Sequence, residues 1–190
     1  MEFQGAEATV RIEEDRVVKE RKEKQYRHTE IDRELRTERT DQELRLMEEA
    51  DRYGCSVPEV TKTAGNVLEM ERVDGKPLKE VIGKKTGLME SYGENVARLH
   101  SAKIIHGDLT TSNAMASDGL VVIDFGLSFR SERTEDRAVD IHLLRQVLRS
   151  SHPGIAEEAW EKFRQGYSEF EESEEVLEQL EEVESRGRYK

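Results

Sequence analysis

Residues 106–113 read His-Gly-Asp-Leu-Thr-Thr-Ser-Asn, and residues 123–126 read Ile-Asp-Phe-Gly. Asn113 follows Asp108 after four intervening residues, and Asp124 ends a short apolar run. Asparagine and aspartate oxygens are hard ligands that suit a divalent cation carrying a nucleotide triphosphate. Asp108 could then accept a proton from an attacking hydroxyl or water. The two motifs together predict a phosphoryl-transfer site. The alternative is that Asp108 and Asn113 only form a turn and that Asp124 only ends a strand. This alternative explains each motif separately, but it does not explain why both occur in one chain.

A lysine and a glutamate in the front of the chain would complete such a site. Lys19 ends the apolar run Val17-Val18-Lys19, from which its ammonium could reach phosphates. Glu43 follows on a predicted helix and could hold that lysine extended. Residues 5–8 before the first strand read Gly5-Ala6-Glu7-Ala8. The small residues among them would let backbone N–H groups approach a phosphate, whereas an acidic Glu7 is unexpected beside one. Taken alone, Lys19 and Glu43 could equally form an ordinary surface ion pair, which stabilises little.

Composition excludes several classes of protein. The chain has 190 residues, one cysteine (Cys55) and a formal net charge of −12. A single cysteine cannot form an internal disulfide, so a disulfide-stapled scaffold is excluded and a reducing compartment is expected. No run of apolar residues is long enough to span a bilayer, and the start of the chain does not resemble a signal peptide. We therefore expect a cytoplasmic protein without a membrane partner.

The charges are unevenly distributed along the chain. Residues 154–184 contain twelve glutamates and two basic residues, which is typical of solvated helix faces. The end of the chain is basic instead, with Arg186, Arg188 and Lys190. Local patches matter more than the net charge for binding a polyanion. A contact between this tail and an RNA backbone is therefore compatible with the acidic composition.

The pattern of apolar residues predicts strands first and helices later. We expect strands at residues 9–12, 16–19 and 66–70, an extended segment at 57–60, and a polar helix over 29–53 that ends at Gly54. Residues 72–77 carry glycine and proline and are the candidate boundary between two lobes. In the second half, Leu120–Ile123 predicts a buried strand, and helical spacing predicts helices near residues 88–99, 140–150, 154–170 and 172–185.

Several motifs make the chain resemble the protein-kinase superfamily, and more closely the small atypical kinases of the KEOPS complex, the PRPK family. They are Tyr26-Arg27-His28, Arg39-Thr40-x-x-Glu43, the run at residues 106–113 and the run at residues 123–129. The resemblance covers nearly the whole chain. It implies an α+β, two-lobed kinase-like fold related to RIO kinases, with an N-terminal lobe over residues 1–74 and a C-terminal lobe over residues 75–190.

The resemblance also implies roles for individual residues. Lys19 would contact the phosphates of ATP, Glu43 would orient Lys19, and Asp108 would be the catalytic base. Asn113 and Asp124 would bind Mg²⁺ or Mn²⁺. The adenine would meet the backbone of residues 69–73. The predicted nucleotide contacts are Gly5, Ala6, Glu7, Ala8, Val17, Lys19, Met70, Glu71 and Val73.

Three departures from ordinary protein kinases bear on the substrate. Gly107 stands where an arginine would read a phosphorylated activation segment, and Thr110 replaces the lysine that usually follows the catalytic aspartate. Residues 127–139 contain no Ala-Pro-Glu and leave little chain for docking a peptide. The family implies a partner-dependent ATPase beside a threonylcarbamoyl-transferase subunit and other KEOPS subunits, acting on tRNA. The alternatives are a free-standing serine/threonine protein kinase, and a kinase-shaped module that only binds tRNA or the partner.

Overall fold

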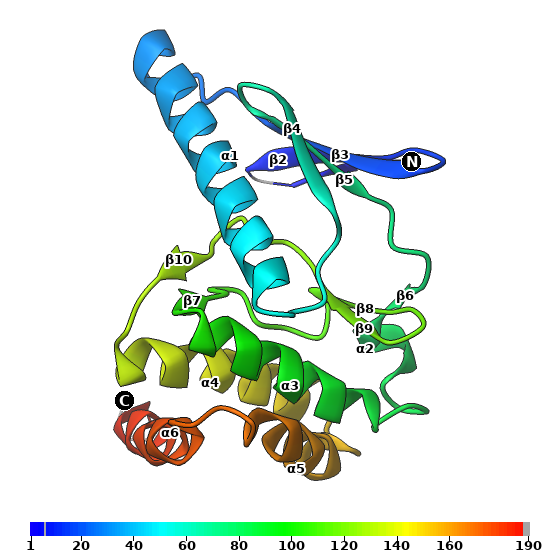
Figure 1. The fold of residues 1–190 in the computed structure, drawn as a ribbon, viewed down its shortest axis with the longest axis vertical. Helices are drawn as coiled ribbons and strands as arrows, with labels where there is room; N and C mark the ends of the chain where they lie inside the picture. Colours follow the sequence, from blue (N-terminus) through cyan, green and yellow to red (C-terminus); the bar gives the residue numbers. More distant parts are fainter. Residues whose placement is uncertain (6, 188–190) are drawn as a thin grey trace.

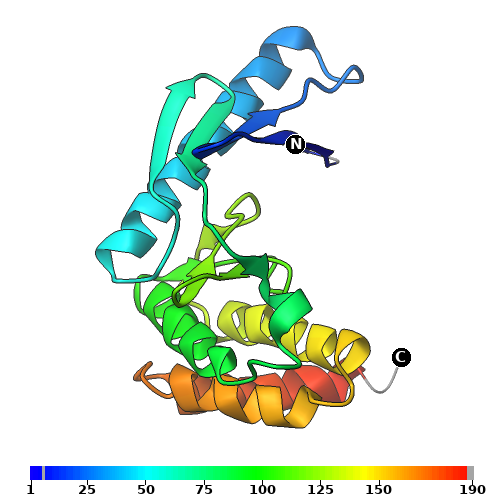
Figure 2. The ribbon, with the colours of Figure 1, turned by 90° about the vertical axis from the view of Figure 1, so that its right-hand side faces the viewer.

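The computed structural model describes residues 1–5 and 7–187. An antiparallel sheet and one long helix lie at one end of the molecule, and the remaining helices lie at the other (Figures 1 and 2). We call these the N-lobe and the C-lobe. The chain passes from one to the other between β5 and β6; the division into lobes over residues 1–74 and 75–190 stays a prediction. The structure thus has the predicted strand-rich front and helical back.

The N-lobe sheet has the order β1-β2-β3-β5-β4, and every neighbouring pair is antiparallel. Helix α1 packs against β4 and β5. The elements are β1 (Glu2–Gln4), β2 (Ala8–Ile12), β3 (Arg16–Arg21), α1 (Thr29–Arg52), β4 (Val60–Ala64) and β5 (Val67–Glu71).

Local chemistry explains where α1 begins and ends. The Asp32 side chain is fully buried in its first turn, where it accepts a hydrogen bond from Arg36 Nε at 2.7 Å and pairs with Arg27 at 3.5 Å. A carboxylate in the first turn also suits the positive end of the helix dipole. Gly54 follows the helix with a φ of +78°, a conformation that glycine adopts without strain. The helix therefore ends as the sequence predicted.

The C-lobe contains helices and two small sheets, ordered β6-β8-β9 and β10-β7. The strands β7, β8 and β9 bring the two chemical motifs of the sequence toward the N-lobe. The elements are β6 (Lys76–Pro77), α2 (Leu78–Val81), α3 (Leu88–Ser101), β7 (Ile104–Ile105), β8 (Ala114–Ala116), β9 (Leu120–Val122), β10 (Phe129–Arg130), α4 (Thr134–Ser151), α5 (Ala156–Tyr167) and α6 (Ser173–Gly187).

Two glycines allow α3 and α5 to pack closely. A Cβ atom on Gly93 would lie 2.1 Å from the carbonyl oxygen of Phe163, and one on Gly166 would lie 1.9 Å from that of Glu90. No side chain fits at such distances, so the two backbones are in direct contact. Tyr92 and Phe163 pack edge to face beside this contact. The pair of helices forms a rigid base for the C-lobe.

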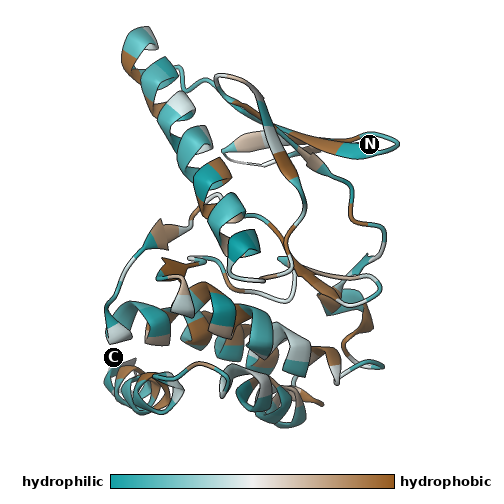
Figure 3. Cartoon of the chain, viewed as in Figure 1, coloured by the Kyte–Doolittle hydropathy of each residue, from teal (hydrophilic) through white to brown (hydrophobic). Residues whose placement is uncertain are grey.

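One hydrophobic core extends through both lobes. Leu46, Met47 and Leu68 of the N-lobe belong to the same buried cluster as the faces of α3, α4 and α5. Hydrophobic residues concentrate in the C-lobe, whereas α1 is mostly hydrophilic along its length (Figure 3). Cys55 is buried in this core, and burial raises the pKa of its thiol to about 12, so it is an inert filler rather than a nucleophile.

Three features differ from the prediction. β1 (Glu2–Gln4) was not predicted, because three residues are too few for a clear apolar pattern; its residues are exposed and pair with β2. α4 begins at Thr134 rather than near Asp140, because Arg137 is buried in its first turns and pairs with Glu172. Within α1, the apolar spacing of the helix also predicts a buried Ile31, but its side chain is exposed.

Candidate nucleotide-binding site

Lys19 joins three elements at the meeting of the two lobes. It lies on β3, and its side chain is buried. Its Nζ lies 2.6 Å from Glu43 Oε1 of α1 and 2.7 Å from Asp124 Oδ1, which follows β9. The Glu43 side chain is 2% exposed, whereas the Asp124 side chain is 52% exposed. The predicted surface-pair alternative for Lys19 and Glu43 is therefore wrong, because this pair is buried.

The ionisation of this cluster follows from its contacts. Burial by itself would lower the pKa of Lys19, but the charges of Glu43 and Asp124 outweigh burial and raise it. Burial would likewise raise the pKa of Asp124, but the Lys19 ammonium lowers it below its ordinary value. Lys19 and Asp124 are therefore both charged at neutral pH.

Asp124 has an unusual backbone. Its φ is +65°, in the left-handed region that aspartate visits more readily than most residues. The Gly126 backbone N–H donates to Asp124 Oδ1 at 3.3 Å. A Cβ atom on Gly126 would lie 3.0 Å from Lys19 Nζ and 3.1 Å from Asp124 Oδ1. Glycine at 126 therefore leaves room for the turn to approach the lysine.

Asp108 and Asn113 form a second pair on the loop between β7 and β8. The Asn113 Nδ2 donates to Asp108 Oδ2 at 2.8 Å and to the Asp108 carbonyl oxygen at 2.9 Å. Because the amide nitrogen is used in this way, its oxygen is the atom that could bind a cation. The Ile123 backbone N–H donates to the Asn113 carbonyl oxygen at 3.0 Å. This bond ties the Asp108 loop to the end of the strand that carries Asp124.

A buried aspartate that the sequence reasoning missed fixes the Asp108 loop. Asp140 of α4 accepts hydrogen bonds from the backbone N–H groups of His106 at 2.8 Å and Gly107 at 2.9 Å. Gly107 has a φ of +79°, and a Cβ atom there would lie 2.5 Å from the Leu127 carbonyl oxygen. Only glycine fits this position. The arginine that ordinary protein kinases have here is therefore also excluded at position 107 for steric reasons.

Arg21 is a further buried residue of the site that sequence reasoning missed. It lies two residues after Lys19 on β3, so the two side chains point to the same face of the strand. Its Nη2 lies 2.5 Å from Glu43 Oε2. Alternate residues of a strand share a face, so the spacing of two residues from Lys19 is the sequence signal that could have predicted Arg21 as part of the site.

The predicted phosphate loop is described only in part, since Ala6 lies outside the described residues. The Gly5 backbone N–H donates to the Ala8 carbonyl oxygen at 2.9 Å, which closes a tight turn. Glu7 pairs with Lys24 at 3.3 Å and with Arg39 of α1 at 3.0 Å. The acidic side chain is therefore tied to neighbouring cations rather than directed at the predicted phosphate position.

The predicted adenine contacts lie where the sheet ends. Val17 pairs with Met70 across β3 and β5. The Glu71 backbone N–H donates to Glu59 at 2.8 Å, so an adenine base would have to use other backbone groups of this segment, such as the Glu71 carbonyl or the Val73 N–H. The roles of Val17, Met70, Glu71 and Val73 stay predictions.

The activation segment is shorter than the sequence suggested, because α4 begins at Thr134. It comprises residues 127–133 and contains β10, which pairs with β7. The Ser128 carbonyl oxygen accepts a hydrogen bond from Gln42 Nε2 of α1 at 2.9 Å, and its hydroxyl donates to the His106 carbonyl oxygen at 2.8 Å. The Leu127 side chain is exposed. The segment thus braces α1 and the Asp108 loop.

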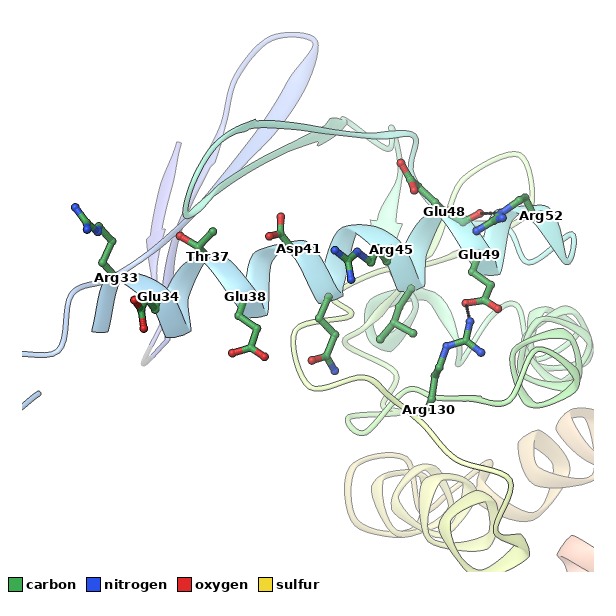
Figure 4. A pocket seen from close by; sticks show the side chains of 12 residues that line it. Arg33, Glu34, Thr37, Glu38, Asp41, Arg45, Glu48, Glu49, Arg52 and Arg130 are labelled. Carbon is green, nitrogen blue, oxygen red and sulfur yellow. Dashed lines mark hydrogen bonds and ion pairs between the residues drawn. The ribbon is translucent and has the colours of Figure 1, made fainter. Parts of the chain in front are cut away.

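A charged groove of about 890 Å³ runs along another face of α1 (Figure 4). Arg130 reaches across it to pair with Glu49. None of the predicted site residues that the structure describes lines the groove, so it is separate from the Lys19 site. Its lining residues are Arg33, Glu34, Thr37, Glu38, Asp41, Gln42, Arg45, Leu46, Glu48, Glu49, Arg52 and Arg130.

Two further expectations bear on ligands and partners. Among the described residues, no group of three or more His, Cys, Asp and Glu side chains could hold a metal ion by itself. A Mg²⁺ ion is commonly held by one or two carboxylates together with substrate phosphates, and the Asn113–Asp124 set fits that pattern.

Among the residues that the structure describes, no helix is both long and apolar enough to cross a bilayer. In the predicted tail, Arg186 pairs with Glu182 and Glu135, and residues 188–190 lie outside the described part.

Comparison with known proteins identifies relatives along the whole chain. The family model described as "RIO domain" matches residues 6–151. The "KEOPS complex subunit Bud32" of Pyrococcus abyssi is 37% identical, over 98% of this chain and 94% of that protein. The "Probable serine/threonine-protein kinase BUD32 homolog" of Archaeoglobus fulgidus is 39% identical, over 98% and 95%.

Other relatives are longer than this chain. The "Probable bifunctional tRNA threonylcarbamoyladenosine biosynthesis protein" of Methanosarcina barkeri is 44% identical over 97% of this chain. The chain spans about a third of the length of such bifunctional relatives, since the match covers 35% of that protein.

Solved structures confirm the predicted fold. The Rio2 kinase of Chaetomium thermophilum, in an ADP/Mg²⁺-phosphoaspartate complex, superposes with a TM-score of 0.67 at 15% identity, over all of this chain and 71% of that one. WaaP in complex with acyl carrier protein gives a TM-score of 0.62 at 14% identity, over 97% and 87%. At these identities the likeness concerns the fold alone, which is kinase-like with a strand N-lobe and a helical C-lobe.

Proposed function

Because the chain belongs to the RIO-domain family and to its Bud32 branch, we propose that it binds ATP with Mg²⁺ or Mn²⁺ and transfers the terminal phosphoryl group, chiefly to water. The process that this reaction would serve is the biosynthesis of threonylcarbamoyladenosine in tRNA, which is named for the bifunctional relatives. The observation that carries the proposal is the buried contact of Lys19 with both Glu43 and Asp124, at 2.6 and 2.7 Å, beside the paired Asp108 and Asn113.

Nucleotide binding is the first step that these residues would perform. The Lys19 ammonium has three donors and can hold Glu43 while it turns another donor toward phosphate. A phosphate at this position would replace Asp124 as the second anion beside Lys19. Adenine would bind at the segment after β5 through the backbone groups near Glu71 and Val73. These contacts position the terminal phosphate without requiring a change in the fold.

Asn113 and Asp124 would hold the divalent cation through the amide oxygen and the carboxylate. When bound, the cation neutralises charge that develops on the phosphate oxygens. Asp108 would accept the proton of the attacking water. Its carboxylate is oriented by Asn113 Nδ2, and its loop is fixed by Asp140. The attacking group is thus aligned by groups that are already in place before the reaction.

Water is the acceptor that the geometry favours over a peptide. A peptide substrate needs a docking surface beside the catalytic aspartate, and the activation segment provides only residues 127–133. Water needs no docking surface. We propose that hydrolysis rises when a threonylcarbamoyl-transferase subunit, other KEOPS subunits and tRNA order the site. The basic tail from Arg186 to Lys190 is the proposed tRNA contact.

The test measures phosphate release and phosphorylation of a generic protein substrate in parallel. Both are followed with and without the transferase partner and tRNA, and Asp108→Asn is the blank. We expect hydrolysis to exceed substrate phosphorylation and to rise with the partner and tRNA. Robust, partner-independent phosphorylation with negligible hydrolysis would instead identify a free-standing protein kinase. Neither activity in any mixture, together with tRNA binding, would identify a kinase-shaped binding module.

A further inference from the structure

One buried carboxylate on α1 is held by two cations from β3. Arg21 Nη2 lies 2.5 Å from Glu43 Oε2, and Lys19 Nζ lies 2.6 Å from Glu43 Oε1. The Arg21 side chain is 5% exposed and that of Glu43 is 2% exposed. Each carboxylate oxygen therefore has its own cation, and both contacts are largely shielded from water.

The reaction makes unequal demands on the two cations. Lys19 is shared between Glu43 and Asp124, and nucleotide phosphates would compete for the same ammonium. Arg21 lies farther from the turn: a Cβ atom on Gly126 would lie 3.0 Å from Lys19 Nζ but 3.8 Å from Arg21 Nη2. A guanidinium also stays charged at every pH of interest. Arg21 can therefore keep Glu43 in place while Lys19 turns toward phosphate.

We propose that Arg21 is a positioning residue that locks α1 in its catalytic position through Glu43. The proposal rests on the proposed function, since it names what holds α1 at that same site. In protein kinases the pair between the strand lysine and the helix glutamate must be in place, and phosphorylation of the activation segment controls it. Here the second cation makes this position permanent, so α1 needs no phosphorylation to stay active.

Other contacts of α1 agree with a fixed helix. Gln42 Nε2 donates to the Ser128 carbonyl oxygen at 2.9 Å, and Glu49 pairs with Arg130. These contacts tie α1 to the activation segment, whereas Arg21 ties it to the sheet. Loss of Arg21 should therefore loosen the middle of the helix around Glu43 without detaching its C-terminal end.

The experiment compares Arg21→Met, Arg21→Lys and the control Arg16→Met in the full chain. Arg16 lies on the same strand, but it is exposed and pairs with Glu13 and Glu69 at the surface. Steady-state phosphate release gives kcat and KM for Mg-ATP, and hydrogen exchange reports on the amides of residues 40–47.

Arg21→Met should lower kcat about tenfold, a coupling typical of residues in one ion-pair network. KM should change by less than about threefold, because the proposed role of Arg21 is to hold Glu43 and not to bind the nucleotide. Exchange in residues 40–47 should become faster. Arg21→Lys should keep kcat within about threefold, since a lysine retains the charge and one donor for Glu43. Arg16→Met should change neither quantity.

Two results would overturn the proposal. Unchanged kcat and unchanged exchange in Arg21→Met would show that Glu43 needs no second cation. A raised KM with unchanged kcat would make Arg21 a phosphate ligand instead. If Arg21→Met does not fold, Arg21→Lys decides, because a kcat below about a third of the wild-type value would contradict rescue by charge.

Failure of the proposed function would be recognisable separately. If the wild-type protein neither binds Mg-ATP nor releases phosphate, that function is wrong. Hydrogen exchange of the nucleotide-free protein still decides on Arg21: faster exchange at residues 40–47 in Arg21→Met supports the lock, and unchanged exchange in that variant refutes it. If the methionine variant does not fold, exchange close to wild type in Arg21→Lys supports a lock held by charge, and faster exchange in Arg21→Lys contradicts it.

Discussion

The nucleotide side and the substrate side of the site are built differently. On the nucleotide side, Lys19 and Glu43 are buried and bonded to one another, and Asp124 completes the contact from the other lobe. On the substrate side, the activation segment comprises only residues 127–133, and its Leu127 side chain is 62% exposed. Buried side chains bonded to one another are thus concentrated where a phosphate would be held, whereas the activation segment offers little surface for a peptide. This difference supports the proposal that the protein acts on a nucleotide with water rather than a peptide as acceptor.

Substitution of Lys19 should have the largest combined effect on phosphate release and stability. Lys19→Met removes the proposed phosphate contact and leaves the buried Glu43 with one cation fewer. We expect phosphate release to fall to background and the free energy of unfolding to drop by about 3 kcal/mol, as for a broken buried ion pair. Denaturant titration and phosphate release measure the two effects.

Lys103→Met is the matched control for this substitution. Lys103 is half exposed and pairs with Glu132 at the surface. Its loss should cost less than about 1 kcal/mol and leave phosphate release unchanged. Hydrolysis at the wild-type rate in Lys19→Met would show that Lys19 does not hold the phosphates, and the contrast between the two sides would then be wrong.

The pair of Lys19 and Asp124 should make stability depend on pH. The lowered pKa of Asp124 gives stability that is present above the ordinary carboxyl range and is lost as the pH falls through the lowered pKa. The raised pKa of Lys19 gives stability that is fully present below the ordinary lysine pKa and is lost as the pH rises through the raised pKa. The contribution is therefore greatest near neutral pH.

Thermal melts of nucleotide-free wild-type protein and Asp124→Asn across this range measure that contribution. The difference in Tm should be largest near neutral pH and should vanish in acid, where Asp124 is protonated. Asp74→Asn is the control, because Asp74 is almost fully exposed. A Tm difference for Asp124→Asn that does not change with pH would show that the ion pair is not its source.

Leu127→Ser should have the smallest effect, in contrast with Phe125→Ser two residues away. Leu127→Ser in the activation segment should change stability by no more than about 0.5 kcal/mol and phosphate release by no more than about twofold. Phe125→Ser removes a side chain that is 1% exposed and should cost about 3–5 kcal/mol. Denaturant titration of both variants tests this; a comparable loss of stability in Leu127→Ser would mean that the segment is as tightly built as the nucleotide side.

Sequence patterns predicted the elements that carry strong local signals. The strand at Leu120 and the helix that begins at Leu88 follow from apolar spacing, and Asp124 follows from its place after the strand. The pairing of Lys19 with Glu43 followed from a lysine that ends a strand and a glutamate on the next helix, and the structure brings them together.

Long-range contacts were beyond such reasoning. Asp140 acts on the backbone of His106 and Gly107 from another helix, and no local pattern links it to that loop. Arg21 was missed because a charged residue at the end of a strand usually lies at the surface, whereas here it is buried against Glu43. Both cases concern buried polar groups whose partners lie far away in the sequence.

Parallel measurement of Mg-ATP binding and turnover in two aspartate variants tests the central claim most directly. Asp124→Asn should abolish the thermal stabilisation by Mg-ATP, because it removes a metal ligand and the partner of Lys19. Asp108→Asn should keep that stabilisation but slow phosphate release by roughly 10²–10⁴, as expected for a general base. Equal loss of Mg-ATP binding in both variants, or unchanged stabilisation in Asp124→Asn, would contradict the division of roles between these two residues.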